Sequence, residues 1–329
     1  MKINIVGCGL SGIVAACLLK NKHEIKIFET RNHIGGNCYD SDMYGILVHN
    51  YGPHIFHTND DEVFNFLSQY TEWIPFKLQP KGNTKIGKIS LPYSKKTISE
   101  IGKELTQNEI IDIIFKDYSE KQWGISFEKI PSTITNRIPK TIDCENPTWF
   151  EGEKYQCIPK KGYTEMFKKM IENVEVKLNC QNNEWKNEQF DLLIYTGKID
   201  EYFNYVYGKL PYRSLDFVHK TTNKKMENFI ENFNTKEQRY TRKYDHSFFS
   251  EKPCNLSVIT EEYPKQCEDG DIPYYPIPWG ESLEIYQKYQ KLSNEEKNVI
   301  FLGRLANYKY LDMWMAVKNV LNKLRYLYE

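Results

Sequence analysis

Three glycines near the start of the chain have the spacing of a nucleotide-binding turn. The segment Gly7-Cys8-Gly9-Leu10-Ser11-Gly12 follows a short apolar run, Lys2–Val6, and precedes a stretch of helical composition, Ile13–Leu19. Glycines permit a close backbone approach to a pyrophosphate, whose negative charge the free N–H groups at a helix start attract. Glu29 follows after about 20 positions, where a carboxylate accepts hydrogen bonds from ribose hydroxyls. The spacing predicts a strand–turn–helix–strand unit that binds a dinucleotide.

A second glycine pair, Gly35-Gly36, comes shortly after Glu29 in the segment Arg31-Asn32-His33-Ile34-Gly35-Gly36-Asn37. A flavin cofactor needs a second close approach of the backbone, near its pyrophosphate and ribityl chain, and a nicotinamide cofactor does not. The pair therefore favours FAD over NAD, with a plain Gly-Gly turn as the alternative.

Two histidines, His54 and His57, lie three positions apart in the next polar segment. A metal site requires a third ligand at a recognisable spacing, and the sequence offers none, so we predict no bound metal. The alternatives are a histidine packed in the core and a loop that packs against the flavin ring. The place of the segment, directly after the glycine pair, favours the loop.

The composition excludes several classes of protein. The 329 residues carry 44 basic and 44 acidic side chains, so no net charge draws the chain onto nucleic acid or an anionic membrane. No run of about 18 apolar residues predicts a membrane span. The eight cysteines are scattered, which favours reduced thiols in a cytoplasmic protein. The motifs H-E-x-x-H, G-x-S-x-G and the P-loop are absent, so nothing indicates a side-chain nucleophile.

The hydrophobic pattern predicts an α/β protein whose nucleotide-binding domain is discontinuous, because strands of that domain both open and close the chain. Helices are predicted over Asp60–Trp73, Gln107–Trp123, Tyr163–Ile171 and Asp312–Leu327. Strands are predicted over Glu24–Phe28, Val174–Asn179, Phe190–Tyr195 and Asn298–Leu302, with an antiparallel layer over 211–278 and a linker or hairpin over 77–95.

Longer blocks of the sequence resemble the UDP-galactopyranose mutase family, FAD enzymes that interconvert the pyranose and furanose forms of UDP-galactose. The matching blocks are G-C-G-L-S-G, R-N-H-I-G-G-N-C-Y, Y-G-P-H-I-F-H-T, Y-S-E-K-Q-W-G, R-I-P, Y-T-G-K-I-D-E-Y-F, Y-R-S-L, Y-T-R, G-D-I-P-Y-Y-P and G-R-L-A-N-Y-K-Y-L-D-M. They occur in family order over nearly the whole chain.

The resemblance implies three structural units and a UDP-sugar as partner. The units are a Rossmann-like FAD-binding domain (1–75 plus 160–210 plus 280–329), a helical domain with a mobile substrate loop (76–147), and an antiparallel sheet domain (148–159 plus 211–279). The stretch from residue 80 to Tyr118 is shorter than in the family, so the helical domain is trimmed. Because that domain contributes to dimerisation in the family, a homodimer and a monomer are both left open.

The resemblance also implies which residues contact FAD. His57 would lie beside the flavin on a loop that responds to its redox state, in a catalytic role. The other implied cofactor-binding residues are Gly7, Gly9, Leu10, Ser11, Gly12, Glu29, Gly36, Asn37, His54, Ile55, Arg213, Arg304, Leu311, Asp312 and Met313.

The substrate carries a diphosphate, which guanidinium groups bind bidentately at any working pH. The resemblance assigns this catalytic role to Arg137 and Arg242, with hydroxyls of Tyr275 and Tyr310 donating to the same phosphates. It further implies that Tyr118 stacks on uracil. The remaining implied substrate-binding residues are Asn232 near the uridine, Trp123 at the mobile loop, and, at positions that depart from the family pattern, Ile114 and Trp149.

The implied reaction is a ring contraction without net oxidation. In the family, N5 of reduced FAD attacks C1 of galactose, UDP leaves, and the ring recloses from the 4-hydroxyl. The departures around the base keep a related nucleotide sugar, such as UDP-N-acetylgalactosamine, as an alternative substrate. The sequence is also compatible with a flavin-dependent oxidoreductase of the amine-oxidase type and with an inactive protein that binds FAD or a nucleotide sugar.

Overall fold

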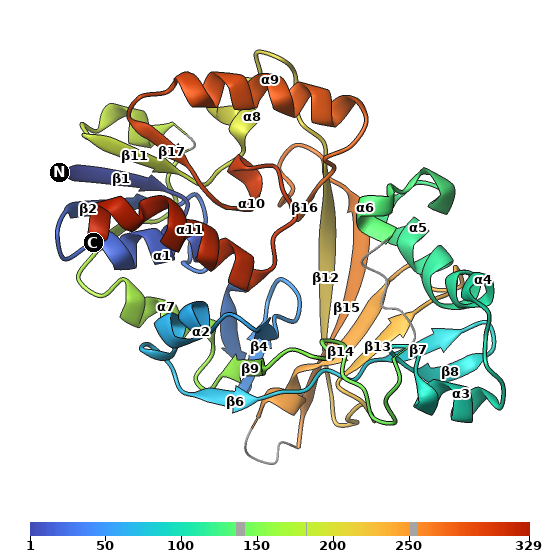
Figure 1. Cartoon of the computed structure of the whole chain (residues 1–329). Coiled ribbons are helices and arrows are strands. Elements are labelled where there is room, and N and C mark those ends of the chain that lie inside the picture. The colour runs from blue at the N-terminus through green and yellow to red at the C-terminus, as the bar shows by residue number, and fades with distance from the viewer. Residues whose placement is uncertain (136–141, 182, 251–254) are drawn as a thin grey trace.

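Five parallel strands form the sheet that carries the first glycine turn. The computed structural model describes residues 1–135, 142–181, 183–250 and 255–329. The strand order is β10 (Glu175–Lys177), β2 (Glu24–Phe28), β1 (Lys2–Val6), β11 (Leu192–Tyr195) and β17 (Val299–Phe301). All neighbours are parallel. The predicted α/β class with a Rossmann-like order is confirmed, and the strands come from the start, the middle and the end of the chain (Figure 1).

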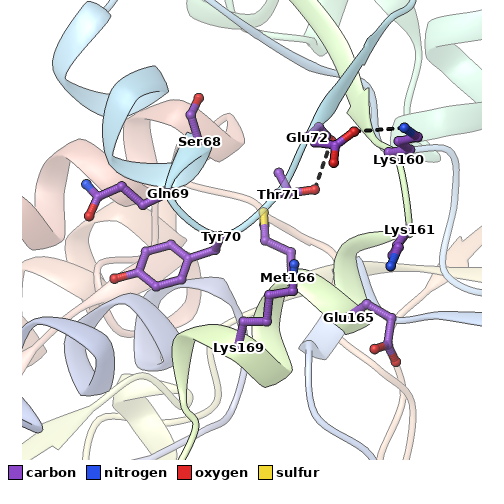
Figure 2. A pocket seen from close by; sticks show the side chains of 10 residues that line it. All are labelled: Ser68, Gln69, Tyr70, Thr71, Glu72, Lys160, Lys161, Glu165, Met166 and Lys169. Atoms are coloured by element: carbon purple, nitrogen blue, oxygen red, sulfur yellow. Dashed lines mark hydrogen bonds and ion pairs between the residues drawn. The ribbon is translucent and has the colours of Figure 1, made fainter.

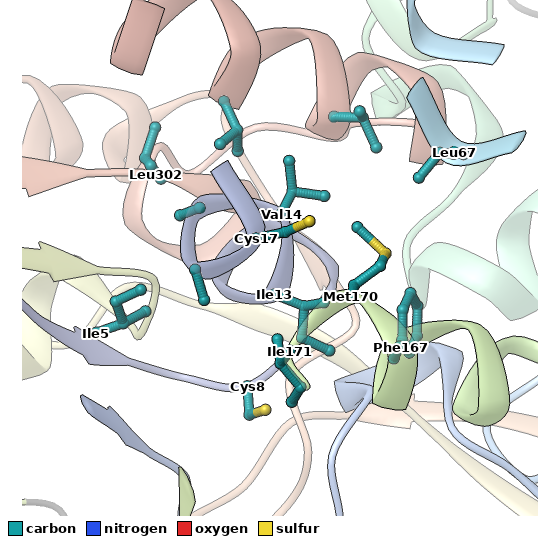
Figure 3. Packing of buried hydrophobic residues seen from close by; sticks show 14 of the residues in the cluster. Ile5, Cys8, Ile13, Val14, Cys17, Leu67, Phe167, Met170, Ile171 and Leu302 are labelled. Atoms are coloured by element: carbon teal, nitrogen blue, oxygen red, sulfur yellow. The ribbon is translucent and has the colours of Figure 1, made fainter. Parts of the chain in front are cut away.

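Helix α1 (Leu10–Leu19) is buried because it lies between this sheet and two other helices, α7 (Tyr163–Met170) and α11 (Met313–Tyr328). It begins three residues earlier than predicted, inside the glycine segment. Figure 3 shows side chains of α1, such as Ile13 and Val14, among apolar side chains of these neighbours. Burying an aliphatic side chain of this size contributes about 1.5–3 kcal/mol, so this packing fixes the N-terminal end of α1 relative to the sheet.

A second, seven-stranded sheet lies beside the first. Its order is β16 (Tyr275–Pro276), β12 (Tyr212–Thr222), β15 (Ser257–Gln266), β14 (Arg242–Asp245), β13 (Ile230–Phe233), β7 (Lys81–Thr84) and β8 (Gly87–Ser90). Neighbouring strands are antiparallel except β13 and β7, which are parallel. The segment 77–95 therefore forms a hairpin, one of its two predicted forms, and this hairpin extends the sheet that the 211–278 segment builds.

Helices beyond the β7–β8 hairpin lie on the far side of the long strands β12 and β15 from the five-stranded sheet (Figure 1). They are α3 (Lys95–Ile101), α4 (Gln107–Ile110), α5 (Asp117–Trp123), α6 (Ser132–Thr135) and the 3-10 turn Phe127–Lys129. A π-helical segment, Ile111–Lys116, joins α4 to α5, so the helix predicted over Gln107–Trp123 is continuous but changes its winding midway. Such π segments occur often at functional sites.

The helix predicted over Asp60–Trp73 is too long, because α2 (Asp61–Ser68) ends before Trp73. Trp73 opens strand β6 (Trp73–Pro75), its ring stacks on Phe56 at 5.1 Å, and its Nε1 donates to Ser68 Oγ at 2.8 Å. The tertiary contacts of the Trp73 indole therefore decide its conformation, although the spacing of apolar residues favours a helix there.

Strand β9 (Tyr155–Pro159) pairs with β6 and with β5 (Phe56–Thr58) in a small sheet of its own. The predicted division groups 148–159 with the large sheet instead. The division into three units itself stays a prediction.

The remaining elements connect these layers. They are β3 (Asp40–Met43), β4 (Ile46–His49), α8 (Ile199–Tyr202), α9 (Glu281–Glu295), α10 (Gly303–Ala306) and the 3-10 turns Gly36–Cys38, Glu184–Asn187 and His246–Phe249. Helix α9 was not predicted, because only Tyr286 and Tyr289 of its residues are buried and its apolar stripe is narrow. No helix in the described part of the chain is long and apolar enough to cross a membrane.

Candidate functional site

The two glycine turns pack directly against each other. Gly9 and Gly35 form a β-bridge, and a Cβ added to Gly36 would lie 2.8 Å from the Cα of Gly9. Gly7, at φ +99°, has no room for a Cβ, which would lie 2.1 Å from Thr196 Oγ1. At Gly12 a Cβ would lie 2.0 Å from the carbonyl oxygen of Gly7. The glycine spacing therefore reflects close contact at each of these positions, with backbone at Gly12 and Gly36 and with the Thr196 side chain at Gly7.

A cavity of about 670 Å³ opens at this junction. The first turns of two long helices face it, through Leu10 and Ser11 of α1 and through Asp312 and Met313 at the start of α11. Helix N-termini attract negative charge. The predicted cofactor residues that line the cavity are Gly7, Gly9, Leu10, Ser11, Glu29, Gly36, Asn37, His54, Arg304, Leu311, Asp312 and Met313.

Glu29 is buried at the end of β2, and its carboxylate organises the backbone of both turns. Oε2 accepts from the N–H of Cys8 at 2.7 Å, and Oε1 accepts from the N–H of Arg31 at 2.9 Å. A carboxylate offers about four lone-pair directions, so it can also accept from a ribose hydroxyl.

Arg31 is a cavity residue that the sequence reasoning missed. Its Nη2 donates to Asn37 Oδ1 at 2.8 Å, its guanidinium lies over the ring of Tyr51, and its buried Nη1 has no hydrogen-bond partner among the described residues. A cation placed two residues after Glu29, the acid predicted to bind ribose, is the signal that could have found it. Its free N–H group suits an anionic ligand.

Three predicted cofactor residues do not line the cavity. Gly12 lies beneath it, at the contact with Gly7. Ile55 is buried in a separate apolar cluster. Arg213 is 5% exposed, and it donates from Nε to the carbonyl of Gln122 at 2.8 Å and from Nη2 to that of Lys121 at 3.3 Å. The guanidinium thus caps the C-terminal end of α5.

The two histidines have different surroundings. His54 lines the cavity, and its Nδ1 lies 2.7 Å from the carbonyl oxygen of Gly52. His57 is not among the lining residues: its Nδ1 lies 2.9 Å from Glu153 Oε2, and its ring stacks on Phe150 at 3.6 Å. The structure therefore places His54, rather than His57, beside the cavity.

Burial keeps several histidines neutral. It lowers the pKa of His54 to about 4, with Arg304 and Arg242 acting in the same direction, and it lowers the pKa of His246 to about 3. The pKa of His49 is also held well below its ordinary value by burial and by the neighbouring histidines. His49 and His246 are 2% and 0% exposed.

These pKa values predict acid sensitivity. In the unfolded chain the histidines take up protons below about pH 6.5, whereas the folded protein excludes them down to about pH 4, so stability is lost as the pH falls through this window. We expect the free energy of unfolding to drop by on the order of 5 kcal/mol from pH 7 to pH 4, measured by urea titration. His246→Asn, which keeps an acceptor for the N–H of His49, should show a shallower pH slope. Equal slopes for wild type and variant would contradict this explanation.

Strand pairing brings two predicted residues, Asn232 and Arg242, together with Glu262, which the sequence analysis did not identify. On adjacent strands, Asn232 of β13 is opposite Arg242 of β14, which is opposite Glu262 of β15. Arg242 donates to Glu262 Oε1 from Nη2 at 2.7 Å and from Nε at 3.1 Å. Glu262 is fully buried. Burial lowers the pKa of Arg242, but the charge of Glu262, its hydrogen bond and the nearby Tyr118 and Tyr275 together outweigh burial and raise this pKa well above its ordinary value. Asn232 Oδ1 and Glu262 Oε2 are buried and have no hydrogen-bond partner among the described residues.

Several aromatic rings lie beside Arg304, which lines the cavity. Tyr275 stacks on Tyr310 at 5.7 Å, and the guanidinium of Arg304 lies over both rings. Trp123 at the end of α5 meets Tyr275 edge-on at 6.1 Å, and also meets Trp279, a residue that the sequence reasoning missed, at 5.1 Å.

Tyr118, five residues before Trp123 on α5, is half-buried. Burial raises the pKa of Tyr118 to about 12, although Arg242 opposes the shift. Its phenol is therefore a protonated hydrogen-bond donor near neutral pH.

The remaining predicted substrate residues do not join this group. Ile114 is 1% exposed in the apolar cluster of the helical segment, and Trp149 packs against the same cluster. Arg137 lies outside the described residues.

A separate pocket of about 270 Å³ lies between the end of α2 and α7 (Figure 2). It contains none of the predicted residues, and its Glu72 forms an ion pair with Lys160 at 2.7 Å.

Comparison with known proteins links this geometry to one family. The family model described as UDP-galactopyranose mutase matches residues 113–310, and that of the NAD(P)-binding Rossmann-like domain matches residues 5–70. The chain is 33% identical to the UDP-galactopyranose mutase of Mycoplasma genitalium, over 99% of this chain and 94% of that protein. It is 31% identical to the dTDP-fucopyranose mutase of Escherichia coli, over 97% and 96%. A crystal structure of reduced UDP-galactopyranose mutase shares the fold, with a TM-score of 0.71 at 14% identity over 99% and 96% of the two chains.

Proposed function

Because the chain belongs to the UDP-galactopyranose mutase family, we propose that it interconverts UDP-galactopyranose and UDP-galactofuranose with FAD as cofactor. The observation that supports this most strongly is the connection between the cavity and the Arg242–Glu262 ion pair. Arg304, which lines the dinucleotide-type cavity, lies over the stacked rings of Tyr275 and Tyr310, and Tyr275 interacts electrostatically with both Arg304 and the Arg242–Glu262 pair.

The cavity fits FAD. Close contacts at Gly7, Gly12 and Gly36 leave no space for side chains next to α1, whose first turn can bind a pyrophosphate. Glu29 would bind the adenosine ribose, and Arg31 offers an unpaired buried N–H group for an anion. His54 and Met313, which also line the cavity, would border the flavin ring.

Bound in its reduced form, FAD supplies a nucleophilic nitrogen, N5, for a covalent link to C1 of galactose. The chain's own residues bind and orient the substrate. Arg242 would neutralise the diphosphate that departs, because its charge is fixed by Glu262 and its N–H groups do not titrate. The hydroxyls of Tyr275 and Tyr310 would donate to the same phosphates, and Tyr118 would stack on the base, which contributes about 1–3 kcal/mol.

A second candidate substrate is dTDP-fucopyranose. The similarity to a dTDP-fucopyranose mutase spans the whole chain at nearly the same identity as that to the UDP-galactopyranose mutases. The two sugar nucleotides share the diphosphate and the anomeric carbon and differ in the base and at the sugar, and Arg242 and its neighbours would serve either one.

One experiment tests both candidates. Dithionite-reduced protein is incubated with UDP-galactopyranose, UDP-N-acetylgalactosamine and dTDP-fucopyranose, and pyranose and furanose products are separated by chromatography. We expect a furanose product from at least one of them with reduced protein and none with oxidised protein. No product from any of them would overturn the proposal, and hydrogen peroxide formation with an amine would favour an oxidase instead.

A further inference from the structure

Side-chain contacts at three points join the loop over residues 234–241 to helix α5 and to the π-helical segment that precedes it. The loop joins β13 to β14, and the strands at its two ends carry Asn232 and Arg242. The helix carries Tyr118 and Trp123. The two halves of the proposed nucleotide site therefore belong to elements far apart in sequence. Contacts between these elements must fix the relative position of the two halves.

Lys121 makes the central contact. Its Nζ donates to three carbonyl oxygens, those of Phe233 at 2.8 Å, Gln238 at 3.0 Å and Tyr240 at 2.9 Å. An ammonium has three donors, so these bonds use all of them and satisfy three carbonyls in and next to the loop. Charge-assisted bonds of this kind are stronger than neutral ones. Burial lowers the pKa of Lys121 to about 8, while Asp117 opposes the shift, so these acceptors compensate a real desolvation cost.

Two other contacts flank Lys121 and act between the same elements. Lys236 of the loop forms ion pairs with Glu120 at 2.6 Å and with Asp117 at 3.9 Å, both on α5. Asn234, at 2% exposure, donates from Nδ2 to the carbonyl of Ile114 at 2.5 Å, inside the π-helical segment that precedes α5.

We propose that Lys121 is a positioning residue that holds the helix bearing Tyr118 and Trp123 against the strands bearing Asn232 and Arg242, and so completes the nucleotide-binding half of the site. Lys121 touches no substrate atom in this account. It acts through the helix, whose C-terminal end Arg213 of β12 caps at the carbonyls of Lys121 and Gln122. The inference rests on the proposed function in one respect, that a nucleotide stacks on Tyr118.

The test compares Lys121→Met with Lys129→Met, a matched loss of an exposed lysine after α5. We expect Lys121→Met to raise the dissociation constant for UDP and the KM for the sugar nucleotide by about 10-fold, as expected when a stacking residue loses its fixed position. Turnover at saturation should stay within about threefold, and FAD content should be unchanged, because Lys121 does not line the cofactor cavity. Lys129→Met should match wild type. Lys121→Arg, which keeps donors and charge, should give an intermediate KM and provides a second variant if Lys121→Met does not fold.

The outcomes separate this inference from the mutase proposal. Wild-type turnover together with unchanged UDP affinity and KM in Lys121→Met or Lys121→Arg overturns the role of Lys121 alone. A loss of UDP affinity in the variants, with no furanose product from wild type, overturns the mutase and leaves Lys121 in place. Failure of wild type to bind UDP overturns both.

Discussion

Arg242→Ala is expected to remove most turnover and to destabilise the protein as well. The substitution leaves the carboxylate of Glu262, which is fully buried, without its cation. Removing one partner of a buried ion pair typically costs about 3–5 kcal/mol, because the other charge stays buried and uncompensated. Under the proposed function Arg242 would face the departing diphosphate, so losing this cation should reduce turnover by about 10²–10³-fold.

A double variant separates these two effects. Arg242→Met combined with Glu262→Met replaces the pair by apolar side chains, which is often neutral for stability. We expect the double variant to regain most of the urea midpoint and to bind FAD, since neither side chain lines the cavity, but to form no furanose product. Lys243→Ala, on the opposite face of the same strand, is the matched control and should behave like wild type. An active Arg242→Ala protein would remove this residue from the site.

Gly36→Ala is expected to abolish FAD binding. The residue has φ +56°, and the new Cβ would lie 2.8 Å from the Cα of Gly9, so the two glycine turns must separate. Both turns belong to the cavity wall, and their separation displaces the first turn of α1 from the pyrophosphate position.

The variant Gly45→Ala is a control that separates the steric clash in Gly36→Ala from the effect of backbone strain. Gly45 also has a left-handed backbone, at φ +80°, but nothing lies within 4 Å of the added Cβ. Both variants therefore carry about 1–2 kcal/mol of backbone strain, and only Gly36→Ala carries the clash. The measurement is the flavin content of purified protein from its visible absorbance. We expect it near wild type for Gly45→Ala and near zero for Gly36→Ala, and equal flavin content in the two variants would contradict this account.

The sequence alone was enough to predict the part of the cavity formed by the first glycine turn and Glu29. The turn from β1 into α1 is local, and its requirements are local as well: a positive φ at Gly7, close backbone contact at Gly12 and a carboxylate at the end of the next strand. Residue types at fixed spacing encode such requirements directly. Element order likewise predicted the parallel sheet, because alternating strands and helices have few ways to pack.

Only the tertiary structure decided how the rest of the site is assembled. Asn232, Arg242 and Glu262 meet because three strands pair in one register, and a shift of one residue would turn each side chain to the other face. Of two histidines three positions apart, pairing with Glu153 takes His57 away and leaves His54 at the cavity. The positioning role proposed for Lys121 depends on its hydrogen bonds to carbonyls more than a hundred positions away along the chain. No local spacing in the sequence encodes such contacts. The burial of these side chains and their hydrogen-bond and ion-pair partners arise only when distant segments pack, and they determine what each side chain can do.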